Sequence, residues 1–163
     1  MIEIRPIQEH EIQEAKRVIF TVAYEVFREA STLEESIVKY SAQGVLSEMD
    51  DVQKNYFENG GTFLAIRDGD RIIGTGAIRF LEEGVCELKR LWLLTGYHGQ
   101  GLGYRMMQEL FAFAREKKYK LMRLQTDNVV QTRAIAFYRK LGFYEIPRYE
   151  GDDPEDLAME LAL

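Results

Sequence analysis

The chain has 163 residues, of which 46% are hydrophobic, and we therefore expect one core and a single domain over residues 1–163. Its only cysteine, Cys86, excludes an intrachain disulfide, and the two histidines, His10 and His98, offer no metal-ligand spacing, so no metal is expected. No apolar run approaches the roughly 18 residues of a membrane span, and the start lacks a secretory signal. These features predict a cytoplasmic protein without a membrane partner.

The charged side chains are distributed unevenly around a net charge of -6. Residues 89–140 hold 11 basic and 3 acidic side chains, a balance of +8, whereas residues 1–60 hold 12 acidic and 6 basic ones, a balance of -6. Residues 141–163 hold 7 acidic side chains and 1 basic one, again -6. A basic stretch suits a phosphorylated ligand, and acidic flanks suit a cationic second ligand and disfavour nucleic acid. Solvated helix faces would produce the same pattern.

The first 60 residues are predicted to be mainly helical. Residues 2–5 alternate as a short strand that ends at Pro6. Apolar residues then recur at helical spacing and predict an amphipathic helix from about residue 9 to about residue 29. Thr32 and Glu35 form a capping-box pattern that favours a helix over residues 33–40. A last helix is predicted to stop at Gly60-Gly61, from the apolar positions Leu46, Met49, Val52, Tyr56 and Phe57.

From residue 62 the hydrophobic period changes to two. Residues 62–67, 71–80 and 85–94 predict three consecutive antiparallel strands, joined by turns at residues 68–70 and 82–84. Residues 102–118 and 132–141 predict helices, the second one capped by Gly142, and residues 121–126, 143–146 and 157–161 predict strands. This order indicates an α/β (α+β) fold, with a mixed, mostly antiparallel seven-stranded sheet and helices on both faces.

A glycine-rich loop, LLTGYHGQGLGYR over residues 93–105, joins the third of these strands to the helix that follows. It does not match the dinucleotide motif GxGxxG, which would need glycine in place of Tyr104, nor a P-loop, which needs Lys and Ser or Thr after its last glycine. Glycines before a helix still let backbone N–H groups turn toward an anion such as pyrophosphate. The alternative purpose of Gly99, Gly101 and Gly103 is close packing of strand against helix.

The strand before this loop carries a break in its alternation. In the segment CELKRLWLL the apolar parity slips between Leu88 and Leu91, as a β-bulge would cause. A bulge would splay this strand from its neighbour and leave backbone groups free to pair with an extended ligand.

Two motifs resemble the GCN5-related N-acetyltransferase (GNAT) superfamily. HGQGLG, residues 98–103, is similar to that family's Arg/Gln-x-x-Gly-x-Gly/Ala at a helix start after a bulged strand, with His98 at the Arg/Gln position. AIAFYRKLGF, residues 134–143, is similar to its A-I-x-x-Y-x-K-x-G-F signature, with Gln131 where the family commonly has Asn. The order of elements also fits, so the resemblance covers essentially the whole chain.

The resemblance implies the acyl-CoA N-acyltransferase fold and acetyl-CoA as the donor. The pyrophosphate would be held by backbone N–H groups of residues 99–104, and the pantetheine arm would lie along residues 91–93 like an extra strand. The Leu93 N–H would stabilise the oxyanion, and Tyr138 would protonate the CoA thiolate. The implied cofactor-binding residues are Leu91, Trp92, Leu93, His98, Gly99, Gln100, Gly101, Leu102, Gly103, Tyr104, Gln131 and Tyr138.

Acyl transfer also needs a base, because an amine with a pKa of about 10.4 must lose a proton before it attacks. We predict that Glu87 has this role, directly or through a water, since it lies on the splayed strand a few residues before the expected thioester site. The alternative is a carboxylate paired with Lys89 or Arg71 on the sheet surface. Glu82 and Glu83 are weaker candidates for the base.

Two other side chains also have a purely structural alternative. Tyr138 fits an ordinary apolar helix face, and only the surrounding signature favours a role as acid. Cys86 could carry an acyl group with the help of His98, but its place in an apolar strand favours a buried thiol.

The predicted function is transfer of acetyl from acetyl-CoA to the primary amine of a small cationic acceptor, by direct attack in a ternary complex. Residues 1–60 and the acidic loop at residues 150–156 would wall the acceptor site. Two alternatives stay open, a non-catalytic acyl-CoA sensor and a phosphate-binding enzyme that uses another nucleotide. Trp92 and the last strand could belong either to the core or to a homodimer interface.

Overall fold

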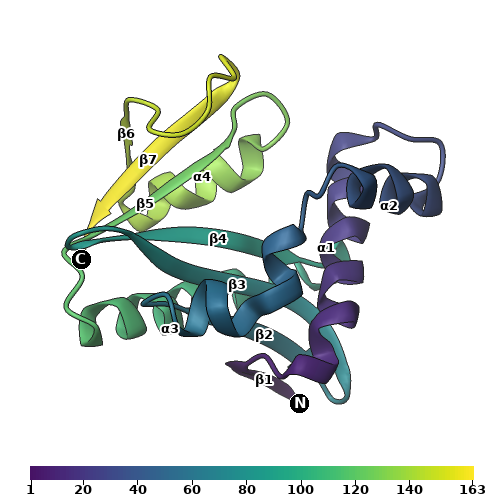
Figure 1. Ribbon diagram of the computed structural model, residues 1–163, viewed down its shortest axis with the longest axis horizontal. Helices are drawn as coiled ribbons and strands as arrows, with labels where there is room; N and C mark the ends of the chain where they lie inside the picture. Colours follow the sequence, from purple (N-terminus) through teal and green to yellow (C-terminus); the bar gives the residue numbers. More distant parts are fainter.

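Residues 1–163 are all described by a computed structural model, in which seven strands form one sheet. Figure 1 shows their order, β1-β2-β3-β4-β5-β7-β6. Neighbouring strands are antiparallel except β4 and β5, which are parallel, so the predicted mixed sheet is confirmed. The strands are β1 (Ile2–Pro6), β2 (Thr62–Asp68), β3 (Arg71–Glu82), β4 (Val85–Leu93), β5 (Leu121–Asp127), β6 (Tyr144–Ile146) and β7 (Asp156–Ala162).

The helices agree with the predictions except between residues 46 and 57. The α-helices are α1 (Ile12–Phe27), α2 (Leu33–Ala42), α3 (Leu102–Glu116) and α4 (Thr132–Leu141). Short 3₁₀ helices are η1 (Glu9–Glu11), η2 (Ser47–Asp51) and η4 (Thr95–Tyr97), and η3 (Gln53–Phe57) is a π-helix. None of these helices combines the length and the apolar character needed to cross a lipid bilayer.

The α-helix predicted to end at Gly60 is wrong, because its residues form the 3₁₀ helix η2 followed by the π-helix η3. Leu46, Met49 and Val52 are three residues apart, and all three are buried. A 3₁₀ helix has three residues per turn, so this spacing places them on one side of the tighter helix. The sequence pattern identified the buried positions but not the type of helix.

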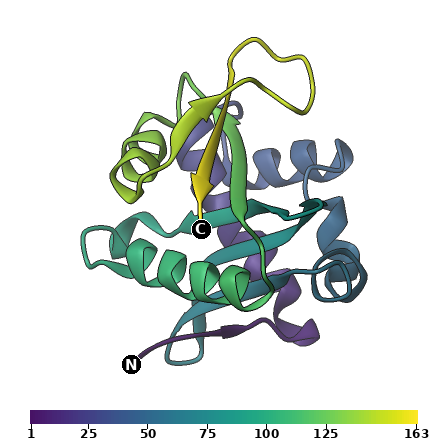
Figure 2. The ribbon, with the colours of Figure 1, turned by 90° about the vertical axis from the view of Figure 1, so that its left-hand side faces the viewer.

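The two faces of the sheet carry separate cores. Helices α3 and α4 cover one core, which includes Ile78, Leu88 and Met106, and α1, η2 and η3 cover the other, which includes Met49 and Phe63. Figure 2 shows α3 and α4 on the opposite side of the sheet from η2 and η3. Successive strand residues point to opposite faces, so alternate positions of β4 reach different layers.

Candidate active site

The strands β4 and β5 diverge in the middle of the sheet. They pair only over residues 85–87 of β4 and 121–123 of β5. Beyond these residues β4 continues to Leu93 and β5 to Asp127 without pairing to each other, and Figure 1 shows them fanning apart from the end near the C-terminus. The second half of β4 therefore has a free backbone edge of the kind that binds an extended ligand.

A bulge lies in β4 beyond its last pair with β5, between Leu88 and Trp92, as the sequence predicted. Between the pairs Thr75–Trp92 and Ala77–Lys89, one residue of β3 faces two residues of β4. Arg90 lies within this bulge and has a left-handed φ of 56°. This conformation is uncommon for a residue with a side chain, so the surrounding structure must hold it.

The contacts of Arg90 explain how the bulge is held. The Thr75 hydroxyl donates a hydrogen bond to the Arg90 carbonyl over 2.7 Å. The Arg90 guanidinium donates to the Val45 carbonyl over 2.9 Å and pairs with the Glu48 carboxylate, which lies on η2. The bulge is thus fixed by β3 on one side and by the α2–η2 segment on the other.

The ladder after the bulge orients the Leu93 amide. The Leu94 N–H donates to the Ile73 carbonyl over 2.9 Å, and Gly74 is the residue opposite Leu93. Gly74 and Leu93 are therefore a non-hydrogen-bonded pair of the antiparallel ladder, in which the N–H groups point away from each other. The Leu93 N–H faces the open side of β4, where it can donate to a ligand.

The glycine loop leaves a series of N–H groups free at the start of α3. Gly99 and Gly101 have φ values of 81° and 77°, and a Cβ at either position would have no atom within 4 Å. The N–H groups of residues 99–104 donate to no backbone acceptor, and the Arg105 N–H makes the first helical bond, to the Gly101 carbonyl over 3.0 Å. These donors lie at the positive end of the helix dipole, which favours an anion.

Close packing, the alternative purpose of the glycines, applies only to Gly103. A Cβ at this position would stand 3.5 Å from the Phe137 ring, whereas the positions of Gly99 and Gly101 are open. The left-handed backbone, rather than lack of space, therefore accounts for glycine at residues 99 and 101.

A cavity of about 380 Å³ lies beside the loop and the free edge of β4. It is lined by every residue of the implied cofactor-binding set except Gln100 and Tyr138. Val22 and Val26 of α1 and Phe137 of α4, for which no ligand contact was predicted, also line it. Their apolar helical spacing indicated burial but not the surface against which they would lie.

His98 and Gln131, the two residues that differ from the family motifs, both line this cavity. The His98 ring is hydrogen bonded through Nε2 to the Leu93 carbonyl over 3.0 Å, and because a carbonyl only accepts, Nε2 carries the proton. Its Nδ1 is buried and has no partner. The imidazole thus ties the loop to the end of β4. Gln131 precedes α4, and its side chain makes no capping hydrogen bond, which leaves the amide free for a ligand.

Tyr138 lines a smaller cavity of about 130 Å³ between β4 and β5. The two cavities adjoin, since both are lined by Leu91, Trp92 and Gln131. Tyr138 is 7% exposed, and burial raises its pKa above the ordinary value of 10. The hydroxyl is therefore protonated at neutral pH, the state that a proton donor requires.

Glu87 faces the α1 side of the sheet and is 1% exposed. Its Oε1 accepts a hydrogen bond from Arg79 Nε over 3.2 Å and forms an ion pair with Nη2 over 3.1 Å. Its Oε2 accepts a hydrogen bond from the Tyr149 hydroxyl over 2.8 Å. The ion pair suggested as the alternative role exists, but its partner is Arg79, opposite in the register, rather than Lys89 or Arg71. Both carboxylate oxygens are engaged, so a direct contact with an amine would have to displace one of these donors.

Cys86 is buried, as the sequence favoured. Burial raises the pKa of its thiol to about 12, so the group is uncharged at neutral pH. An uncharged thiol is a poor nucleophile, which argues against an acyl-carrying role.

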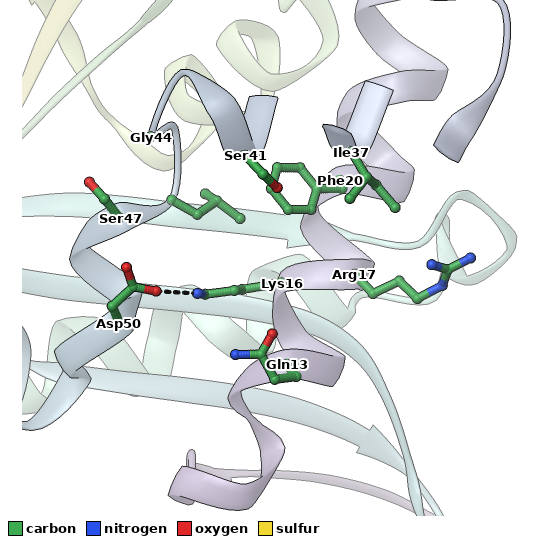
Figure 3. A pocket seen from close by; sticks show the side chains of 10 residues that line it. Gln13, Lys16, Arg17, Phe20, Ile37, Ser41, Gly44, Ser47 and Asp50 are labelled. Carbon is green, nitrogen blue, oxygen red and sulfur yellow. Dashed lines mark hydrogen bonds and ion pairs between the residues drawn. The ribbon is translucent and has the colours of Figure 1, made fainter. Parts of the chain in front are cut away.

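Another cavity, of about 360 Å³, lies between α1, α2 and η2. Figure 3 shows Phe20 and Ile37 at one end of it, the ion pair of Lys16 with Asp50 across it, and Arg17 extending away from the rest. None of its lining residues lies on β4, in the glycine loop or on α4, so it is separate from the site described above.

The sheet, the divergence and the glycine loop together match a known family. The model of the Acetyltransferase (GNAT) family matches residues 24–143, more than half of the chain. The chain belongs to the GNAT family. Its seven-stranded sheet is the acyl-CoA N-acyltransferase fold of that family, as the sequence motifs implied.

Individual relatives of this GNAT chain are distant. It is 28% identical over 115 residues to Probable N-acetyltransferase family 8 member 5 of Mus musculus, covering 68% of this chain and 50% of the mouse protein. It is 34% identical over 104 residues to IAA acetyltransferase of Azospirillum brasilense, covering 62% and 67%. The chain thus spans about half the length of the mouse relative. The PaiA N-acetyltransferase of Thermoplasma acidophilum, solved in complex with coenzyme A, has the same fold, with a TM-score of 0.77, 22% identity and coverage of 100% and 99%.

Proposed function

We propose that the protein transfers an acetyl group from acetyl-CoA to a primary amine, by direct attack within a ternary complex. The proposal rests on one observation: the free edge of β4 and the unpaired N–H groups of residues 99–104 border the same cavity. Membership of the GNAT family supports it, as does the coenzyme A found in the Thermoplasma neighbour.

The donor cavity suits a CoA molecule mainly through its backbone. The N–H groups of residues 99–104 would hold the pyrophosphate, while Arg133 is the only lysine or arginine that lines the cavity. The apolar side chains of Val22, Val26 and Phe137 suit the pantetheine arm, whose amides can pair with the free edge of β4. When bound, acetyl-CoA supplies an activated thioester carbonyl.

The residues around the divergence then have three roles. Glu87 accepts the proton of the amine through a water, since Arg79 and Tyr149 occupy its oxygens. The Leu93 N–H donates to the carbonyl oxygen as negative charge develops there. Tyr138 donates its proton to the departing sulfur as the new N–C bond replaces the C–S bond.

We further propose a small acceptor whose amine is cationic in solution. The segment between β6 and β7 is anchored by the Tyr149–Glu87 hydrogen bond and carries four exposed acidic side chains, Glu150, Asp152, Asp153 and Glu155. This acidic rim would raise the local concentration of a protonated amine. The acidic side chains among residues 1–60 contribute less to this attraction, because several of them form ion pairs. Examples are Glu48 with Arg90 and Asp50 with Lys16.

The reaction is tested by two measurements on the purified chain. Calorimetry should show CoA binding, and release of free thiol from acetyl-CoA should depend on an added amine. A non-catalytic acyl-CoA sensor is the second candidate, favoured by the departures at His98 and Gln131 from the family motifs. Binding without thiol release across a broad amine panel would favour the sensor, and absence of CoA binding would contradict both functions.

The charge of the acceptor is tested by kinetics at two salt concentrations. Zwitterionic and cationic amines should have a higher kcat/KM than amines of net negative charge, and this advantage should shrink at high salt because the rim is exposed and screened. A preference for amines of net negative charge would contradict the proposed acceptor.

A further inference from the structure

Lys89 is a lysine without a partner beside the divergence of β4 and β5. It follows Glu87 on the same face of β4, is half-buried and lines the cavity of about 130 Å³. No carboxylate lies within ion-pair distance of its ammonium group. The neighbouring arginines are all neutralised: Arg79 pairs with Glu87, Arg90 with Glu48, and Arg123 with Glu82 and Glu160.

The surroundings of Lys89 raise the free energy of its unpaired ammonium group. Burial lowers the pKa of its ammonium group. Glu87 and Glu150 act in the opposite direction, whereas Arg90 and Arg79 add to the lowering. A partly desolvated cation is stabilised when an anion enters its site, because the pair replaces the lost hydration. The lining of the cavity of about 130 Å³ therefore includes a cation that no ion pair neutralises.

The position of Lys89 fits a bifunctional acceptor. It lies two residues before Leu91, the start of the segment expected to lie along the pantetheine arm, and only the bulge at Arg90 separates the two. An amino carboxylate separates its amine from its carboxylate by only a few bonds. Its amine could thus reach the thioester end of the donor while its carboxylate contacts the flexible Lys89 side chain.

We propose that the acceptor carries a carboxylate in addition to its amine, and that Lys89 binds this carboxylate. The inference rests on the acetyl transfer proposed above and names the class of acceptor, namely amino acids and related amino carboxylates. The acidic rim attracts the ammonium end, and Lys89 selects the carboxylate end. An acidic rim combined with a basic Lys89 disfavours the binding of simple polyamines, because they carry no carboxylate to pair with Lys89.

The test compares pairs of acceptors that differ only in the carboxylate. The panel contains L-amino acids, β-alanine and γ-aminobutyrate, each beside its own carboxamide, and kcat and KM are measured by thiol release. For the wild type we expect the acids to be favoured. Lys89→Met should raise KM for the acids about 10- to 100-fold, the range for losing a hydrogen bond to a charged group, and leave the amides nearly unchanged. Lys89→Arg should retain most of the preference.

Lys140→Met is the matched control, since Lys140 is exposed on α4 and lines neither cavity, and it should behave as the wild type. Unchanged CoA affinity and Tm in the Lys89 variants would show that the donor site and fold are intact. Calorimetric titration of acid and amide into the CoA complex gives a readout independent of turnover, and only the acid should lose affinity in Lys89→Met.

Three results would overturn the inference while leaving acetyl transfer intact. The first is equal use of acids and amides by the wild type, and the second is an equal fall in kcat for both classes in Lys89→Met. The third is acetylation of Lys89 itself by acetyl-CoA, detected by intact-mass measurements. Absence of thiol release with every acid and amide would instead contradict the transfer reaction, and the inference would fall with it.

Discussion

At the scale of single residues, the site depends on side chains whose hydroxyl and carboxylate groups are held in place by packing. The Tyr138 ring lies 5.7 Å from the Phe143 ring and 5.9 Å from the Phe137 ring, centroid to centroid. These contacts fix the phenol at the edge of the cavity between β4 and β5, and burial keeps it protonated by raising its pKa. A rigid, protonated phenol is suited to donate to a departing thiolate.

Replacing Tyr138 by phenylalanine keeps the ring and removes only the hydroxyl. We expect kcat to fall by about 100-fold or more, the usual contribution of a general acid, with CoA affinity unchanged. Thiol release and calorimetry measure the two quantities. Tyr144→Phe, on the exposed strand β6, is the control. Equal activity of Tyr138→Phe and the wild type would remove Tyr138 from the role of acid.

Glu87→Gln tests whether the buried carboxylate accepts a proton or only anchors Arg79. If it is the base, kcat should fall by about 100-fold. Arg79→Gln breaks the same ion pair from the other side and should cost stability with a smaller loss of kcat. Similar kinetic losses in the two variants would assign Glu87 a purely structural role. The exposed Glu83→Gln should match the wild type.

At the scale of elements, the donor site is a junction in which a strand ends its pairing just before a helix begins. β4 stops pairing with β5 after Glu87, the bulge at Arg90 follows, and two left-handed glycines then turn the N–H groups of the loop toward the cavity. The His98 ring connects the two parts through the Leu93 carbonyl. No single residue supplies the anion site, because its donors belong to the backbone.

Gly101→Ala tests whether the loop conformation matters for the donor. A Cβ at φ 77° costs roughly 1 kcal/mol, although the space around it is open. We expect a lower Tm and CoA binding weakened by about fivefold, the equivalent of that energy. Gly96→Ala is a matched control, since Gly96 has open space and no positive φ. A Gly101→Ala variant that binds CoA as tightly as the wild type would contradict the amide cradle.

At the scale of the whole molecule, ion pairs distant in sequence fasten the N-terminal segment to the sheet. Arg67 of β2 donates from Nε to Glu11 of η1 over 2.6 Å, and both side chains are buried. Burial raises the pKa of Glu11, but hydrogen bonds from Arg67 and the Gln8 N–H outweigh it and lower the pKa below the ordinary 4.5. This pair contributes stability above pH 4.5 and loses it as the pH falls through the lowered pKa.

Glu11→Gln should therefore change how stability depends on pH. We expect the free energy of unfolding at pH 7 to fall by about 2 kcal/mol, because Arg67 is left with an uncharged partner. The difference from the wild type should shrink below pH 4.5, where the wild-type carboxylate becomes protonated. Urea titrations at pH 7 and pH 3.5 measure both values, with the exposed Glu9→Gln as control. A difference that stays constant over this range would contradict the linkage.

Much of the architecture follows from patterns within short stretches of sequence. Period-two alternation located β2, β3 and β4, and the parity slip between Leu88 and Leu91 located the bulge. The bounds of α4 and its cap at Gly142, which has a φ of 107°, were also predictable, since helix periodicity and capping are local effects. The same local rules failed for residues 46–57, where a spacing of three is shared by the 3₁₀ helix and the face of an α-helix.

The sequence by itself determined the glycine loop, the bulge and the succession of helices and strands along the chain, because backbone conformation and hydrophobic period depend on neighbouring residues. Only the tertiary structure decided which side chains meet across the sheet. Tyr149 reaches Glu87 from 62 residues away, and Arg90 reaches Glu48 from 42 residues away. Such contacts depend on which strands become neighbours and on how far β4 and β5 diverge. No local pattern encodes either, so the partner of Glu87 and the lack of one for Lys89 emerge only once the sheet is assembled.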